Sequence, residues 1–171
     1  LKNINTDYAF ILNPDVILES DTIDQIIKAS NKLESFGIIA PLESNENFPN
    51  YKLHKKKKLK QDQINPFTVK SVDGYAMLLN LKRINLLDNF DYFDENFFMY
   101  LENDDLCKRL QNHQEQIYVV PKSRIKHLGG KAVDQIYEYE IELSRNWHWI
   151  WSKFYFNKKH NGFFLALLIC L

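Results

Sequence analysis

Three short segments of the chain place carboxylate, amide or imidazole side chains at the expected ends of strands or helices, where α/β proteins usually build their sites. The first segment is Asn13-Pro14-Asp15, directly after the apolar run Tyr8 to Leu12. A carboxylate at the end of a buried strand is a hard oxygen ligand, which suits Mg²⁺ or Mn²⁺ carried by a diphosphate. Taken alone, the same tripeptide is more simply interpreted as an ordinary turn.

The second segment is Glu102-Asn103-Asp104-Asp105, which opens an expected helix. The helix dipole explains one or two acidic residues in a first turn, but three are harder to explain in this way. Glu102 and Asp105 are three residues apart on one helix face, so their repulsion should raise the pKa of one of them and supply a general base. Asp105 can also pair with Arg109 four residues later, which would keep it ionised. Either Glu102 or Asp105 remains a candidate for the base.

The third segment is His127-Leu128-Gly129-Gly130, after a strand and a basic stretch. Paired glycines allow the backbone to approach a phosphate or a sugar, and a neutral imidazole can complete a metal site. A single histidine in a loop is more often structural. Together with Asp15 and the acidic pair, however, it predicts one active site that combines a metal with a base.

The elements that must position these segments indicate an α/β domain. The apolar run Tyr8 to Leu12 is typical of a buried strand, Ser20 or Asp21 can cap the helix that follows, and Gly37 to Pro41 is the next strand. This order of strand, helix and strand favours parallel pairing.

Further elements follow along the chain. A strand over Val69 to Asn80 is interrupted at Gly74, where the missing side chain permits a close approach to the backbone. A helix over Leu101 to Gln114 and a strand over Gln116 to Pro121 come next. The polar segment around Lys55 to Lys58 is expected to be a solvated loop, with a patch for anionic head groups or phosphates as the alternative.

Composition limits the classes of function. Lys plus Arg balance Asp plus Glu at 22 each, so no overall field favours a nucleic-acid partner. Cys107 and Cys170 lie far apart without metal-ligand spacing, which argues against a disulfide framework and a zinc module and fits a cytoplasmic setting. The chain begins at Leu1 without Met, as expected of a piece of a longer protein.

Five segments in this order closely resemble the rhamnosyltransferase-like members of family 2 glycosyltransferases: ILNPDVIL, VDGYAMLLN, FDENFFMYLENDDLCKRL, IKHLGG and RNWHWIWSKFYFNKKHNG. The resemblance runs from Tyr8 to Gly162. It implies the GT-A fold, an α/β fold with a mixed, mainly parallel sheet flanked by helices. Residues 1–133 would form the metal and acceptor side of the catalytic domain. The βαβ unit that binds the nucleotide in family members would be missing before Leu1.

The resemblance also implies ligands for the donor. Asn13 and Asp15 match the family's metal motif, so Asp15 would hold Mg²⁺ or Mn²⁺ on the diphosphate of a nucleotide sugar. His127 would join the metal shell. Asp73 and Gly74 match the strand that borders the donor sugar and the acceptor.

The acceptor side follows from the same comparison. Phe93-Asp94-Glu95 matches a stretch that leads into the acceptor site. Glu102 and Asp105 match two acidic positions whose carboxylates include the catalytic base. The sequence departs from the family at Asn103, where the usual acidic residue is replaced by an amide that cannot act as a base.

The expected activity is therefore inverting transfer of a sugar, with dTDP-rhamnose suggested as the donor. The acceptor would be a saccharide or a lipid-linked saccharide in the synthesis of cell-surface polysaccharide. The alternative is a noncatalytic fragment or carbohydrate-interaction module that retains the fold, which Asn103 and the missing unit favour. A metal-dependent phosphohydrolase is less favoured because a second cluster of metal ligands is lacking.

Residues 134–171 form a helical segment that is rich in aromatic and basic side chains. Trp and Tyr are enriched at the head-group depth of membranes, and cations meet anionic lipid there, so the pattern favours peripheral contact with the inner face of the cell membrane. The alternative is packing against the domain's own sheet. The final run, Phe163 to Leu171, has nine residues, fewer than the roughly 20 that a spanning helix needs. It is either a truncated membrane-touching helix or the last buried helix of the domain.

Overall fold

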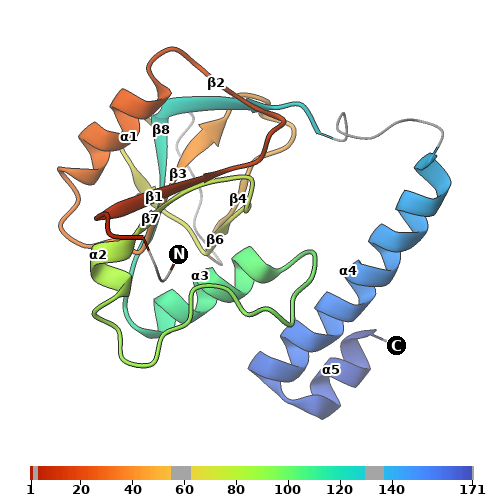
Figure 1. Cartoon of the computed structure of the whole chain (residues 1–171). Helices are drawn as coiled ribbons and strands as arrows, with labels where there is room; N and C mark the ends of the chain where they lie inside the picture. The colour runs from red at the N-terminus through yellow and green to blue at the C-terminus, as the bar shows by residue number, and fades with distance from the viewer. Residues whose placement is uncertain (2–3, 55–62, 130–136, 171) are drawn as a thin grey trace.

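Apolar runs of the sequence become strands, and helices follow them, in a computed structural model (Figure 1), which describes residue 1 and residues 4–54, 63–129 and 137–170. The Asp21 side chain makes no capping hydrogen bond at the start of the first helix, contrary to the expected cap. The strands are β1 (Tyr8–Leu12), β2 (Val16–Leu18), β3 (Ile38–Glu43), β4 (Tyr51–Lys52), β5 (Phe67–Thr68), β6 (Ser71–Val72), β7 (Ala76–Asn80) and β8 (Ile117–His127). The helices are α1 (Thr22–Ser30), α2 (Leu81–Ile84), α3 (Glu102–Asn112), α4 (Glu138–Asn161) and α5 (Phe163–Cys170). Lys55 to Lys58, Gly130 and the expected boundary between residues 133 and 134 lie outside the described residues.

The main sheet is mixed, and its order is β1-β7-β3-β8-β2, with β5 also paired to β8. Of the pairs in this sheet, only β3 with β8 is parallel; the others among the described strands are antiparallel. The prediction of an α/β fold with a mixed sheet is confirmed, but the prediction that the sheet is mainly parallel is wrong. The physical reason is that β7 lies between β1 and β3 and runs antiparallel to both. The strand, helix, strand unit therefore gives β1 and β3 the same direction without making them neighbours.

Helices cover both faces of this sheet. Alternate residues of a strand point to opposite faces, so Ile38 and Ala40 belong to one core cluster and Ile39 to the other. The cluster around Ile38 includes Leu106 of α3, whereas the cluster around Ile39 includes Ile26 of α1. The sheet is thus the middle layer between α1 and α3, and β7 and β8 are buried along most of their length.

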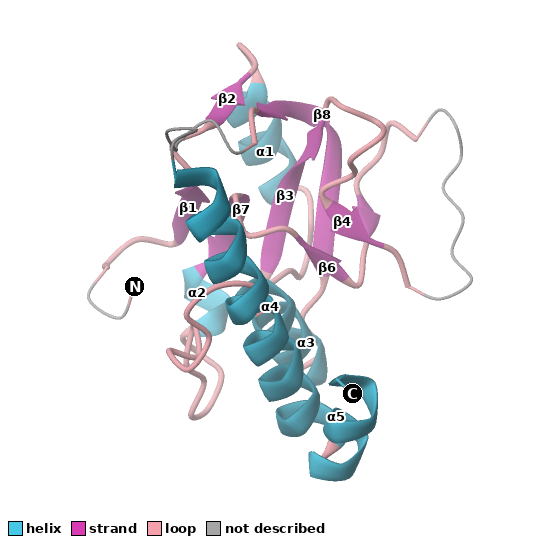
Figure 2. Ribbon diagram, turned by 90° about the vertical axis from the view of Figure 1, so that its right-hand side faces the viewer, coloured by secondary structure: helices cyan, strands magenta, loops and turns pink. Residues whose placement is uncertain are grey.

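The last two helices form a hairpin beside α3 (Figure 2). The chain turns between α4 and α5 at Gly162, whose φ of 90° is unfavourable for residues with a side chain. Ser152 of α4 donates a hydrogen bond of 2.6 Å to the Met99 carbonyl, and Lys159 lies 2.8 Å from the Asp105 carboxylate on α3. These contacts hold α4 against the loop and helix that contain the acidic segment.

Candidate functional site

Asp15 and His127 meet because β2 pairs with the end of β8. Asp15 occupies the turn before β2, and Val16 is the direct antiparallel partner of His127. The Leu128 amide donates to the Asp15 carbonyl at 3.0 Å, which completes this pairing. The Asp15 Oδ2 atom consequently lies 3.2 Å from His127 Nε2, and both side chains are largely but not fully buried. The antiparallel pair that the sequence did not predict is what brings these two predicted residues together.

Two residues that were not anticipated hold the imidazole in place. The Tyr75 ring stacks on the His127 ring with centroids 4.0 Å apart, and the His127 amide donates to Glu43 Oε2 at 2.9 Å. Burial raises the pKa of the Tyr75 phenol, and the nearby Glu43 carboxylate raises it further, so Tyr75 stays protonated. The backbone N–H of Asn13 donates to the Tyr75 carbonyl at 2.9 Å, which ties the turn containing Asp15 to Tyr75. Glu43 ends an apolar strand, and this position was the available signal for it.

A cavity of about 700 Å³ opens beside the imidazole and is called the His127 cavity below. Its lining consists of Glu43, Asn45, Asn47, Phe48, Pro49, Asp73, Tyr75, His127, Leu128 and Gly129. Asp15 is not part of this lining and adjoins the cavity through its contact with His127. The cavity therefore combines polar side chains with one exposed aromatic ring, Phe48, as a site for a polar ligand requires.

Asp73 connects the His127 cavity with the first turn of α3. Burial raises the pKa of Asp73; Lys52 lowers it, Asp104 raises it and His127 lowers it. The pKa of Asp73 therefore depends on charges on both sides, on the His127 imidazole and on Asp104 of α3. Asp104 itself is engaged with Lys52 and with the Ser71 hydroxyl, each at 2.6 Å.

Gly74, the residue after Asp73, lies against the start of α3. A Cβ atom built on Gly74 would lie 3.4 Å from Glu102 Oε1, an ordinary van der Waals distance. Glu102 Oε2 is buried and is without a hydrogen-bond partner among the described residues. Burial raises the pKa of Glu102, its own backbone amide lowers it, and Asp104 raises it. A carboxylate that is desolvated and has one oxygen without a hydrogen-bond partner is suited to accept a proton.

The backbone places Glu102 with an unusual turn. Tyr100 and Leu101, the two residues before it, adopt left-handed conformations with φ of 68° and 64°. Such conformations cost about 1–2 kcal/mol per residue for side chains other than glycine. The Tyr100 ring contacts the Trp149 ring on α4, with centroids 5.7 Å apart. Long-range packing therefore maintains a turn that local sequence preferences disfavour.

Asp105 occupies a different environment from Glu102. Its side chain is fully buried, and its carboxylate lies 2.7 Å from Arg109 Nε and 2.8 Å from both Lys159 Nζ and His160 Nε2. Burial would raise the pKa of Asp105, but hydrogen bonds from Lys159 and Arg109 lower it below its usual value. Of the two candidate bases, the geometry favours Glu102. Asp105 instead joins α3 to α4.

Asn103 replaces the acidic residue of the resembled motif and is mostly buried. Its side-chain amide donates to the Val72 carbonyl at 2.6 Å, which ties α3 to β6. An amide nitrogen can make this contact and a carboxylate cannot. Asn103 is therefore suited to bind the backbone at Val72, directly before Asp73 and Gly74.

The metal that the resemblance implies would have two neighbouring side chains as ligands, Asp15 and His127. Over the described ranges, no group of three or more His, Cys, Asp or Glu side chains is placed to hold an ion. Mg²⁺ is usually bound through one or two protein ligands together with waters and substrate phosphates. The pair thus fits an ion that arrives with a diphosphate better than a permanently bound ion.

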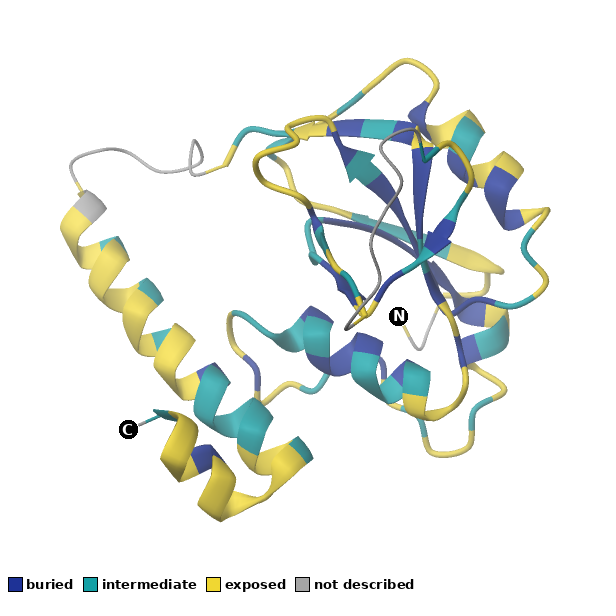
Figure 3. Cartoon of the chain, turned by 180° about the vertical axis from the view of Figure 1, so that it is seen from behind, coloured by how far each residue is buried: buried dark blue, intermediate teal, exposed yellow. Residues whose placement is uncertain are grey.

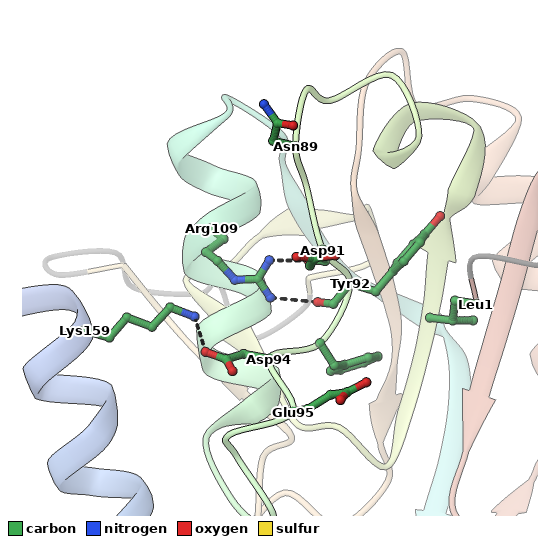
Figure 4. A pocket seen from close by; sticks show the side chains of 9 residues that line it. Leu1, Asn89, Asp91, Tyr92, Asp94, Glu95, Arg109 and Lys159 are labelled. Carbon is green, nitrogen blue, oxygen red and sulfur yellow. Dashed lines mark hydrogen bonds and ion pairs between the residues drawn. The ribbon is translucent and has the colours of Figure 1, made fainter.

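A second cavity, of about 850 Å³, lies at the loop between α2 and α3 (Figure 4). Its lining is Leu1, Asn89, Asp91, Tyr92, Phe93, Asp94, Glu95, Arg109 and Lys159. Arg109 donates to the Asp91 and Tyr92 carbonyls, and Lys159 lies 2.8 Å from the Asp94 carboxylate. The two cations thus already bind groups of the protein, and their contacts fix the loop that contains Phe93, Asp94 and Glu95.

Comparison with known proteins leaves the family open. No protein-family model matches the chain, and a search of curated proteins gives no match. Among solved structures, the chain is similar to A197 from STIV, with a TM-score of 0.49 and 11% identity. This similarity covers 75% of the chain and 59% of A197, so the chain spans less than two thirds of that protein. A likeness at this level supports no statement about function, and the site must be judged on its own geometry.

Proposed function

We propose that the chain is the metal and acceptor side of an inverting glycosyltransferase, related to family 2, that transfers a sugar from a nucleotide diphosphate to a carbohydrate acceptor. The observation that supports it best is the convergence of sequence-distant polar groups. Asp15 lies 3.2 Å from His127, and His127 shares its cavity with Asp73. Gly74 follows Asp73 in the chain, and a Cβ atom built on it would lie 3.4 Å from Glu102 Oε1.

The chemistry requires two groups of opposite character. In a direct displacement, a base takes the proton of the acceptor hydroxyl. The hydroxyl oxygen bonds to the anomeric carbon while the bond between that carbon and the diphosphate oxygen breaks. Glu102, whose pKa is raised by burial, is the proposed proton acceptor. A divalent cation held by Asp15 and His127 would neutralise the charge on the departing diphosphate. One displacement of this kind inverts the anomeric configuration.

The substrate assignment extends this proposal. The resemblance favours dTDP-rhamnose as the donor and a saccharide or lipid-linked saccharide as the acceptor, with synthesis of cell-surface polysaccharide in the cytoplasm as the setting. Assays of the 171-residue chain, and of any longer protein that contains it, should compare dTDP- and UDP-sugars with Mg²⁺ and with Mn²⁺. Release of free nucleoside diphosphate that depends on both metal and acceptor would support transfer.

The metal pair gives a prediction that does not require turnover. Asp15→Asn and His127→Gln should each weaken binding of Mn²⁺ with a nucleoside diphosphate by about 10–100-fold, because each removes one protein ligand. Isothermal titration calorimetry measures this affinity. Asp24→Asn is the matched control, since Asp24 is an exposed acid on α1.

Equal affinities for the parent chain and both ligand variants would contradict the metal assignment. Saccharide binding that needs neither nucleotide nor metal would instead favour the noncatalytic carbohydrate-binding module. The two outcomes are separated by titrating Mn²⁺ with nucleotide and saccharide alone in parallel.

A further inference from the structure

Helix α4 has two faces with different roles. One face contacts the domain: Ser152 donates to the Met99 carbonyl, and the Tyr155 hydroxyl donates to Asp94 at 2.9 Å. Lys159, on the same face by helical spacing, lies 2.8 Å from Asp94. The polar groups of this face thus already have partners in the protein.

The opposite face of α4 is apolar and remains open to solvent. Trp147, Ile150, Trp151 and Phe154 follow the three- and four-residue spacing of one helical stripe. Trp147 is 69% exposed and Ile150 is 58% exposed. Together with Leu167 and Cys170 of α5, these four residues line an apolar groove of about 250 Å³ between the two helices.

Helix α5 continues this surface. Its sequence, FFLALLIC, contains apolar residues only, yet Ala166 is the single buried residue of the helix. Phe164 is 82% exposed and Leu168 is 75% exposed, and in Figure 3 the helix is almost entirely coloured as exposed. A helix that is apolar on all sides is normally buried, in a protein core or in lipid. We define the α4–α5 apolar surface as the four stripe residues of α4 and the apolar residues of α5. This surface is expected to be buried against a partner.

The charges around this surface indicate what kind of partner would bury it. From Leu143 to Leu171 the sequence contains no Asp or Glu, whereas Lys153 and Lys158 are present. Neither lysine pairs with a carboxylate of the described residues. Lys158 follows Trp147, Trp151 and Phe154 on the same stripe, so its ammonium extends from the edge of the apolar surface.

We propose that the α4–α5 apolar surface lies on an anionic lipid bilayer, with α5 and the tryptophans at the depth of the head groups and Lys158 against lipid phosphates. Trp, Lys and Arg beside an apolar face are the composition of helices that lie in the plane of a membrane interface. A second copy of the chain fits less well, because it would bring together two surfaces that carry positive charge and no carboxylate. Over the described helices, none is long and apolar enough to cross a bilayer.

This inference does not depend on sugar transfer, and its probes are internal to the chain. All three tryptophans, Trp147, Trp149 and Trp151, belong to α4. Vesicles of phosphatidylcholine with phosphatidylglycerol should shift the tryptophan emission to shorter wavelength and should bind the full chain on sedimentation. Pure phosphatidylcholine vesicles should bind it more weakly, and added salt should weaken binding to the anionic vesicles.

Substitution of exposed residues tests the surface without disturbing the core. The double variant Phe164→Ser and Leu168→Ser should lower affinity for anionic vesicles by about 100-fold, since burying each side chain contributes about tenfold or more. Lys158→Gln should lower it about fivefold with anionic vesicles and should leave binding to phosphatidylcholine unchanged. Leu86→Ser is the matched control, because Leu86 is 78% exposed but lies outside α4 and α5. Circular dichroism should give all variants the same helix content.

Two results would overturn the proposal. One is the absence of both an emission shift and cosedimentation at high anionic lipid content. The other is a dimer in sedimentation velocity that the Phe164/Leu168 variant converts to monomer while vesicle binding stays unchanged, because a second copy would then be the partner.

Discussion

Glu102→Gln is expected to lower the rate of sugar transfer by about 10²–10⁴-fold, the usual contribution of a general base. The substitution keeps the size of the side chain and removes its ability to accept the acceptor proton. The Glu102 carboxylate is partly desolvated and has an unpaired oxygen, so the neutral amide should not destabilise the fold. Single-turnover assays with donor and acceptor at saturation would measure the loss. Glu34→Gln, at an exposed position after α1, provides the control.

The sign of the pH dependence follows from the raised pKa of Glu102. The base must be ionised to accept a proton, so kcat/KM should rise with pH through this raised pKa. Stability should move in the opposite direction. Because the folded pKa lies above the unfolded value, this carboxyl group contributes stability at acidic pH that is lost as pH rises through the folded pKa. Glu102→Gln should therefore leave Tm at neutral pH unchanged or higher, and a large fall in Tm together with full activity would contradict the assignment.

Asp105→Asn is expected to lower the free energy of unfolding by about 3 kcal/mol. The substitution leaves Arg109, Lys159 and His160 around a buried position without the charge that offsets theirs. Removing one partner of a buried pair costs about 3–5 kcal/mol, and the lower end applies because the Arg109 and Lys159 side chains keep 18% and 26% of their exposure. Urea unfolding followed by circular dichroism gives the value.

The control for Asp105 is a surface ion pair within α4. Glu142 pairs with Arg145 at 2.6 Å, with 53% and 38% of the side chains exposed, so Glu142→Gln should cost less than about 1 kcal/mol. The pKa of Asp105 is lowered in the folded state, so its stabilisation is present above the unfolded pKa and is lost as pH falls through the folded pKa. The difference between parent and Asp105→Asn should therefore shrink in acid. Equal destabilisation by the two variants would exclude the proposed anchor between α3 and α4.

Local patterns in the sequence were sufficient for several elements of the fold. The interruption at Gly74 was predicted, and the structure separates β6 from β7 there. The expected strand over Gln116 to Pro121 is longer, because β8 continues to His127. The alternation of exposed Lys122 and Lys126 with buried Ser123 and Ile125 indicates this extension once the register is known. Strand order was not accessible, because hydrophobic periodicity reports burial and does not report which strand is the neighbour.

The candidate site shows the same division between local and long-range information. Pairing of Asp105 with Arg109 follows from a four-residue spacing and is confirmed. The sequence predicted that repulsion between Glu102 and Asp105 would raise the pKa of one of them. In the structure, burial and the Asp104 carboxylate raise the pKa of Glu102. The contacts of Asp105 with Lys159 and His160 cross more than fifty residues of chain and left no local signal in the sequence.

The two left-handed residues before α3 have a mechanical consequence. Helix α4 holds the first turn of α3 on both sides of Glu102, through Trp149 against Tyr100 and through Lys159 against Asp105. A displacement of α4 would open these contacts and remove packing that maintains the left-handed residues Tyr100 and Leu101. The position of the Glu102 carboxylate is therefore expected to depend on how α4 packs against α3.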